Sequence, residues 1–166
     1  GKNTQGSATN KESFEILNQI IKGRRSVRKW EEKSLDENTI KNIIEIAKWA
    51  PASYNRQLWR VLIIKKQNEK EFAEQFFPNS FYKNAPALLI FLMDKESYGK
   101  NEMHFTYLDG AAFIQNILLL FHSIGLGACW IGFKGWDCYG NAYIETEKID
   151  AFYDYFKLSR SLVPIS

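Results

Sequence analysis

Four cationic side chains and one hydroxyl lie close together in the segment Gly23-Arg24-Arg25-Ser26-Val27-Arg28-Lys29-Trp30. Guanidinium groups bind phosphate through paired, charge-assisted hydrogen bonds, and a neighbouring serine adds a short donor. The composition therefore favours a site for a phosphorylated ligand. A solvated basic turn after a helix would have the same composition, because Arg and Lys complement the negative end of a helix dipole.

A second segment, Ala50-Pro51-Ala52-Ser53-Tyr54-Asn55-Arg56-Gln57-Leu58-Trp59, joins a helical pattern to an apolar run. Its small residues allow the backbone to approach a flat ligand, and its amide side chains offer both a donor and an acceptor to the edge of a heterocycle. Pro, Ser and Asn are also frequent in ordinary polar loops. The segment is thus a second candidate binding element, with a plain loop as the alternative.

Together the two segments resemble the paired signature of the nitroreductase family of flavin enzymes, which bind FMN. RRSVRKW is followed about one helix later by APASYNRQLW. A third segment, Gly125-Leu126-Gly127-Ala128-Cys129-Trp130-Ile131-Gly132-Phe133, resembles the late GLG-x-x-W-I-G element of the family. The three segments occur in the family's order and extend from the first predicted helix to near the C-terminus, so the resemblance covers most of the chain.

The resemblance implies an α+β fold with a central, mostly antiparallel sheet flanked by helices. It also implies a homodimer with two equivalent flavin sites across a two-fold interface, with the buried helix from Phe105 to Ile124 at the dimer seam. Arg24 and Ser26 would contact the phosphate and ribityl chain, and Arg28 would lie at the pyrimidine edge. Twelve cofactor-binding residues are implied by the resemblance: Arg24, Arg25, Ser26, Arg28, Pro51, Ala52, Ser53, Asn55, Gln57, Trp130, Ile131 and Gly132.

The segment from Pro51 to Gln57 would come from the partner subunit and reach the ring, while Trp130 to Gly132 would lie along one ring face. No catalytic side chain is expected, because a flavin carries the hydride chemistry itself. The implied reaction takes a hydride from NAD(P)H through FMN to a small acceptor such as a nitroaromatic or quinone. Alternatives are ene reduction, dehalogenation, azoline oxidation or flavin fragmentation on the same fold, a flavin-binding redox sensor or carrier, and a domain that binds another phosphate.

Composition limits the other classes of function. The 166 residues carry a formal net charge of +3 without a long basic run, so nucleic acid is not an expected partner, and no apolar run is long enough to span a membrane. Cys129 and Cys138 lack the spacing of a zinc site, and no metal is expected. We expect a cytoplasmic protein, although a leading Gly without Met leaves an exported or lipid-anchored form open.

The elements that must position these residues can be predicted from hydrophobic spacing. Residues 1–10 are polar and small and predict a flexible tail, before a single FMN-binding domain over residues 11–166. Five helices are expected. The first runs from Asn10 to Gly23, and the second runs from a Ser34/Glu37 capping box up to Trp49. The others lie over 68–77, from Thr106 to Ser123 and from Thr146 to Phe156. Strands are expected over 59–64, over 85–93 with Pro86 at the start, over 128–133 with Cys129 buried, and from Leu162.

The sequence departs from the family pattern in two places. Leu58 stands where the family usually has Pro before the Trp, which is expected to change only the local turn. In the family a further strand and a C-terminal basic residue that helps to hold the phosphate come after the last predicted strand. Since this sequence stops at Ser166, we expect weaker retention of the cofactor and a shorter arm around the other subunit.

Overall fold

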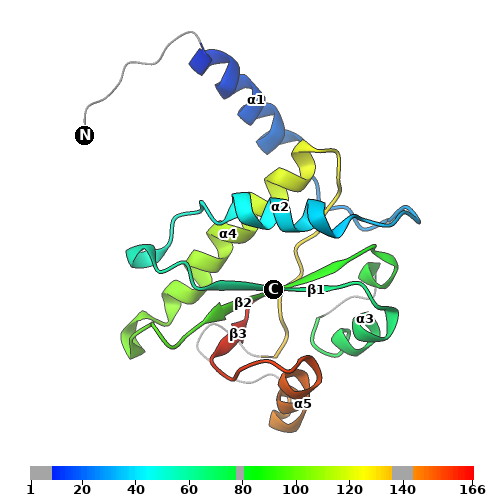
Figure 1. The fold of residues 1–166 in the computed structure, drawn as a ribbon, viewed down its shortest axis with the longest axis vertical. Helices are drawn as coiled ribbons and strands as arrows, with labels where there is room; N and C mark the ends of the chain where they lie inside the picture. Colours follow the sequence, from blue (N-terminus) through cyan, green and yellow to red (C-terminus); the bar gives the residue numbers. More distant parts are fainter. Residues whose placement is uncertain (1–8, 78–80, 136–143) are drawn as a thin grey trace.

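The computed structural model describes residues 9–77, 81–135 and 144–166, and its centre is an antiparallel sheet with the strand order β1-β2-β3. The strands are β1 (Trp59–Ile64), β2 (Leu88–Asp94) and β3 (Leu162–Pro164) (Figure 1). Trp59 lies opposite Met93 and Ile64 lies opposite Leu88, so β1 pairs along almost the whole of β2. The strands predicted over 59–64, over 85–93 and from Leu162 are confirmed, with β2 beginning at Leu88, so that Pro86 precedes it as its missing N–H requires.

The described part of the chain contains five α-helices: α1 (Thr9–Gly23), α2 (Glu37–Ala47), α3 (Gln67–Ala73), α4 (His104–Ser123) and α5 (Thr146–Phe156). Three short 3-10 turns join them: η1 (Ser53–Asn55), η2 (Phe81–Asn84) and η3 (Lys100–Glu102). The α+β class expected from the sequence is confirmed. Because α1 begins at Thr9, the last two residues of the predicted tail are helical.

The longest helix, α4, forms the core on one face of the sheet. It contacts α2, β1 and β2, and it buries Phe113, Ile117 and Phe121 among them. The ring of Phe113 stacks on that of Trp59 with centroids 4.8 Å apart. A Cβ atom at Gly110 would collide with the end of the Ile165 side chain, just after β3, so a larger residue here would force that side chain to move. The helix expected at a dimer seam thus lies mainly in the core of its own chain.

The other face of the sheet is covered by an aromatic cluster from α3 and α5. Phe76 and Phe152 are fully buried with ring centroids 4.9 Å apart, and both belong to the cluster that contains Ile90 and Leu92. Phe91 and Met93, which alternate with those two residues, belong to the α4 side. Both faces of β2 are therefore covered, which explains why its sequence is continuously apolar and does not alternate.

Two local expectations are wrong. The N-cap of α2 is Asp36, whose carboxylate accepts a hydrogen bond of 2.9 Å from the Thr39 N–H, and Ser34 does not cap the helix. Residues 128–133 are extended but form only a single parallel bridge, between Ala128 and Ser26, and Cys129 is half-buried outside any strand. Cys138 lies outside the described residues.

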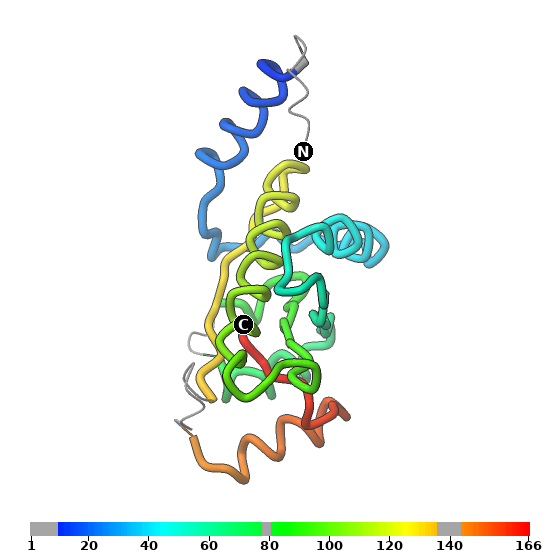
Figure 2. The backbone as a smooth tube through the Cα atoms, turned by 90° about the vertical axis from the view of Figure 1, so that its left-hand side faces the viewer, coloured from blue at the N-terminus to red at the C-terminus, as the bar shows by residue number. Residues whose placement is uncertain are grey.

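Helix α1 stands away from the rest of the chain (Figure 2). The exposed fractions of its apolar side chains are high, at 66% for Phe14, 52% for Ile16, and 51% for both Leu17 and Ile21. A helix whose apolar face is this exposed buries little apolar area within its own chain. Among the described residues, no helix combines the length and apolar content needed to cross a membrane.

Candidate functional site

The arginine segment and the Gly125–Gly132 segment lie side by side in the structure. The N–H of Val27 donates a hydrogen bond of 3.0 Å to the carbonyl of Ala128. A Cβ atom at Gly127 would lie 2.8 Å from the Val27 side chain, so only glycine permits this close approach. Two of the three signature segments are therefore brought together within one chain.

The cations of the arginine segment divide into two groups. The guanidinium of Arg25 donates to the carbonyl oxygens of Lys22 at 2.6 Å and Arg24 at 2.9 Å, so it satisfies the C-terminal end of α1. Arg24 and Arg28 form no ion pair with any carboxylate in the part of the chain that the structure describes. Arg28 Nη1 donates a weak hydrogen bond of 3.4 Å to the carbonyl of Ser26. A guanidinium group without a carboxylate partner attracts an external anion.

Two hollows adjoin the arginine segment, and Lys29 is its cation that lines the larger one. The larger has a volume of about 460 Å³ and is lined by Val27, Trp30, Phe81, Ala128, Trp130 and Ile131 together with apolar side chains of α4. The smaller, of about 200 Å³, is lined by Arg24, Arg25 and His122 at the C-terminal end of α4. Arg28 lies over the Phe81 ring, with its guanidinium carbon 5.8 Å from the ring centroid. An apolar cavity beside an anion site suits a flat ligand that carries a phosphate.

The Pro51–Gln57 segment forms a strained loop that contains η1. Tyr54, Asn55 and Gln57 have φ angles of 52°, 54° and 54°, in the left-handed region that costs a residue with a Cβ roughly 1–2 kcal/mol. The side chains of Asn55 and Gln57 are exposed, and the Gln57 amide donates a hydrogen bond of 3.0 Å to Asn55 Oδ1. The loop therefore presents its amides outward, away from the core of its own chain.

The loop is held by residues that the sequence analysis did not single out. The Oδ1 atom of Asp109 accepts hydrogen bonds from the Ser53 N–H at 3.0 Å and from the Ser53 hydroxyl at 2.8 Å. Its Oδ2 atom accepts a bond of 2.7 Å from the Tyr98 hydroxyl. Burial, reinforced by that hydrogen bond, raises the pKa of Tyr98 above its ordinary value. An acidic residue in an otherwise apolar helical stretch was the available signal in the sequence.

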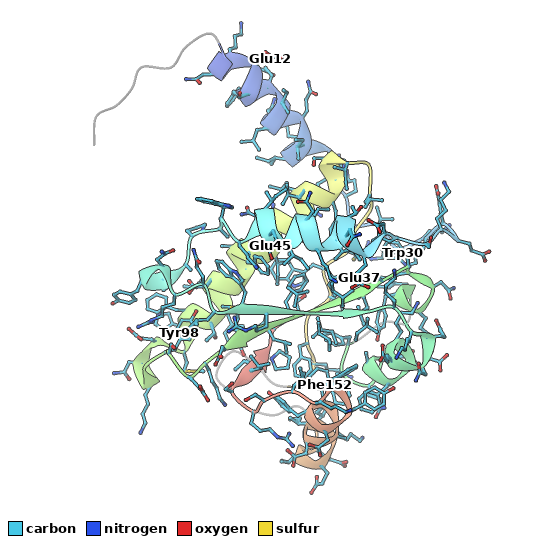
Figure 3. All side chains as sticks on the ribbon, viewed as in Figure 1. Glu12, Trp30, Glu37, Glu45, Tyr98 and Phe152 are labelled. Atoms are coloured by element: carbon cyan, nitrogen blue, oxygen red, sulfur yellow. The ribbon has the colours of Figure 1, made fainter. Side chains whose placement is uncertain are left out.

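The loop and the arginine segment occupy opposite ends of α4. Asp109 holds the loop near the start of the helix, and His122 lies beside Arg24 at its end, so 13 residues, or about 20 Å of helix, separate them. The labelled side chains of Tyr98 and Trp30, which belong to the two ends, lie on opposite sides of the molecule (Figure 3). The structure thus brings the first and third signature segments together but leaves the second apart.

This fold is shared with known proteins. The model of the nitroreductase family matches residues 21–78 and 66–135. A protein of Methanothermobacter thermautotrophicus named "Putative NADH dehydrogenase/NAD(P)H nitroreductase" is 26% identical over 149 residues, which make up 89% of this chain and 72% of that protein.

Two crystal structures extend the likeness. One, named "Putative NADH Oxidase" of Clostridium acetobutylicum, is 28% identical with a TM-score of 0.68, and the match covers 88% of this chain and 82% of that one. The other, described as a "putative nitroreductase in complex with fmn" from Desulfovibrio desulfuricans, is 21% identical with a TM-score of 0.69, and the match covers 90% and 81% of the two chains. The chain belongs to the nitroreductase family, and hence to the oxidoreductases.

Proposed function

We propose that this chain is an FMN-dependent NAD(P)H oxidoreductase that works as a homodimer. The observation that carries the proposal is that Arg24, which has no carboxylate partner among the described residues, lines a hollow that shares Val27 and Ala128 with an apolar cavity of about 460 Å³. A phosphate and a flat ring are the two chemical features that this arrangement suits. FMN has both, and it is the ligand described for the solved Desulfovibrio desulfuricans structure of the same fold.

The residues present fit FMN at both of its ends. Arg24 would bind the phosphate, with the Ser26 hydroxyl as a second donor, while Arg25 is engaged in capping α1. Trp130, Ile131 and Gly132 would lie along the ring as extended backbone, and Gly132 leaves open space because nothing lies within 4 Å of a Cβ placed there. When bound, FMN supplies the hydride transfer from NAD(P)H to an acceptor. Arg28 would stabilise the negative charge that the pyrimidine edge gains on reduction.

A second copy of the chain would complete the site. Within one chain about 20 Å of α4 separates the loop from the arginine segment, so both surround one ring only if they come from different subunits. The exposed apolar face of α1 favours such an assembly, because an apolar helix face that is left in water gains stability by packing on a partner. Pro51, Ala52, Ser53, Asn55 and Gln57 would then reach the partner's cofactor.

The acceptor is a small molecule that lies over the exposed ring face, and a nitroaromatic or a quinone fits this description. The related reactions of the same fold, namely ene reduction, dehalogenation, azoline oxidation and flavin fragmentation, are alternatives within the same use of FMN. A redox sensor or flavin carrier with little turnover is the alternative from another class. These alternatives differ in the fate of the reduced flavin, so kinetics separates them.

The first test is a visible spectrum of purified protein after incubation with FMN and removal of the free cofactor. We expect a yellow protein whose flavin absorbance is bleached by NADH or NADPH in a stopped-flow experiment and is restored by menadione or nitrofurazone. Retained flavin that neither nucleotide reduces would support the sensor or carrier. A protein that stays colourless in excess FMN contradicts the proposal.

A further inference from the structure

Asp109 is a buried charge outside the arginine segment and outside both hollows. Its exposed fraction is 5%, and it lies on α4 among apolar neighbours. Burying a carboxylate is unfavourable unless hydrogen bonds compensate for the lost water. Three donors surround this one, two from Ser53 and one from Tyr98, so the carboxylate links α4 to two different loops.

A second contact fastens the same two loops. Arg56 Nη2 lies 3.1 Å from Glu102 Oε2, which belongs to η3 just before α4. The Arg56 guanidinium lies 4.6 Å from the ring centroid of Tyr54 and 5.3 Å from that of Tyr98. The segment from Tyr98 to Glu102 and the loop from Ser53 to Gln57 are therefore tied together at two points, through Asp109 and through Arg56.

These ties act where the backbone is strained. Tyr54, Asn55 and Gln57 keep left-handed φ angles although none of them is a glycine, and such geometry persists only where surrounding contacts hold it. Ser53 immediately precedes the strained residues and is held by both its N–H and its hydroxyl. The direction in which the Asn55 and Gln57 amides point thus depends on the carboxylate beneath Ser53.

We propose that Asp109 is a positioning residue for the cofactor. By fixing Ser53, it holds the loop in the left-handed geometry that presents the Asn55 and Gln57 amides to the FMN bound by the partner subunit. Tyr98 and Arg56 extend this support to the segment that precedes α4. The inference rests on the proposed function, since it assigns the loop to the second subunit's cofactor.

The test compares Asp109→Ala with Asp109→Asn and with Thr106→Val. Thr106 is a buried polar residue one turn earlier on α4, and its hydroxyl donates a hydrogen bond of 2.6 Å to the carbonyl of Met103, which lies outside the loop. Its variant is the matched control for the loss of a buried polar contact in this helix. Asp109→Asn keeps an acceptor for Ser53, so it should restore part of what Asp109→Ala loses.

Hydrogen exchange of the cofactor-free protein measures directly how firmly the loop is held. Asp109→Ala loses two hydrogen bonds from Ser53 and one from Tyr98, so we expect the amides of residues 53–57 to exchange at least about tenfold faster, while those of β2 stay unchanged. Asp109→Asn should lie between Asp109→Ala and the wild type, and Thr106→Val should match the wild type. If Asp109→Ala does not fold, the Asn variant and Tyr98→Phe carry the test, each with faster exchange confined to the same loop.

Measurements of FMN affinity and of the flavin midpoint potential show whether the loop's geometry matters to the cofactor. We expect Asp109→Ala to bind FMN about tenfold more weakly and to shift the flavin midpoint potential, with neither change in Thr106→Val. Unaltered loop exchange in the Asp109 variants overturns the inference even when the wild type binds FMN. Faster exchange with unchanged affinity and potential also overturns it and leaves Asp109 a structural residue. A wild type that does not bind FMN instead contradicts the proposed function, and the exchange data still show whether Asp109 holds the loop.

Discussion

At the residue scale, Arg24 and Arg25 are adjacent and chemically identical, yet the structure gives them different tasks. Arg25 turns back onto the last carbonyls of α1, while Arg24 lines the smaller hollow next to His122 and has no carboxylate partner among the residues described. The sequence could not separate them, because the direction of each side chain depends on where α1 ends. Phosphate binding should therefore depend on Arg24 far more than on Arg25.

Replacing Arg24 by alanine tests this difference. Arg24→Ala should weaken FMN binding by roughly 1.5–3 kcal/mol, the contribution of a hydrogen bond to a charged group. Arg25→Ala is the matched control, and it should lower the stability of α1 more than the affinity for FMN. Titration of FMN fluorescence measures the affinity. Equal losses of affinity in the two variants would show that the division of tasks is wrong.

Arg28 should act on the redox potential. Its guanidinium carbon lies 5.8 Å from the ring centroid of Phe81, which lines the larger cavity, and it forms no ion pair with any described carboxylate. Arg28→Ala should lower the flavin midpoint potential, because the reduced ring loses a nearby positive charge. Spectroelectrochemical titration measures it, with Lys41→Ala as a control, since Lys41 is paired with Glu37 on α2. If the midpoint potential of Arg28→Ala equals that of the control, Arg28 does not lie at the edge of the ring.

At the scale of single elements, α4 joins the two ends of the candidate site and supplies much of the core. Phe113 is 1% exposed and stacks on Trp59, so Phe113→Ala should lower the free energy of unfolding by about 3–5 kcal/mol. Leu108→Ala, on the same helix but 59% exposed, should change it by less than about 0.5 kcal/mol. Urea unfolding followed by circular dichroism measures both. Comparable losses would mean that α4 is buried on a different face.

The accuracy of the predicted elements varied with the kind of signal. Continuous apolar runs and helical spacing identified β1, β2, α4 and α5, because burial imposes those patterns directly. The cap of α2 was assigned to Ser34 because a Ser with a Glu three residues later fits a capping box, but Asp36 makes the bond to Thr39. The segment over 128–133 has the composition of a strand. Within the described part of this chain, however, it forms only one β-bridge, between Ala128 and Ser26.

At the scale of the whole molecule, the candidate site is divided between two ends of one chain. The sequence shows all three signature segments in the family's order, and the family resemblance assigned them to one cofactor. It could not show that the loop is anchored by Asp109, since contacts between residues 56 positions apart leave no local pattern. The same holds for the division of tasks among the guanidinium groups, which depends on where carboxylates and carbonyls lie in three dimensions.

Assembly through α1 can be tested with charges on its exposed face. The double variant Phe14→Glu with Leu17→Glu should be a monomer by light scattering coupled to gel filtration, because two carboxylates oppose burial of that face. It should also bind FMN at least about tenfold more weakly, since the partner's loop is lost. Glu15→Gln, at an exposed position on the same helix, is the control and should stay dimeric. A dimeric double variant would place the interface elsewhere.

The separation of α1 from the body also bears on how the protein behaves when it is scarce. A lone chain leaves Phe14, Ile16, Leu17 and Ile21 in water, so in the proposed homodimer part of the stability would come from mass action between copies. The melting temperature should then rise with protein concentration, and recovery after denaturation should slow on dilution as the encounter of two chains becomes limiting. A cell that makes little of this protein would then hold more of it as lone chains, in which the apolar face of α1 stays uncovered.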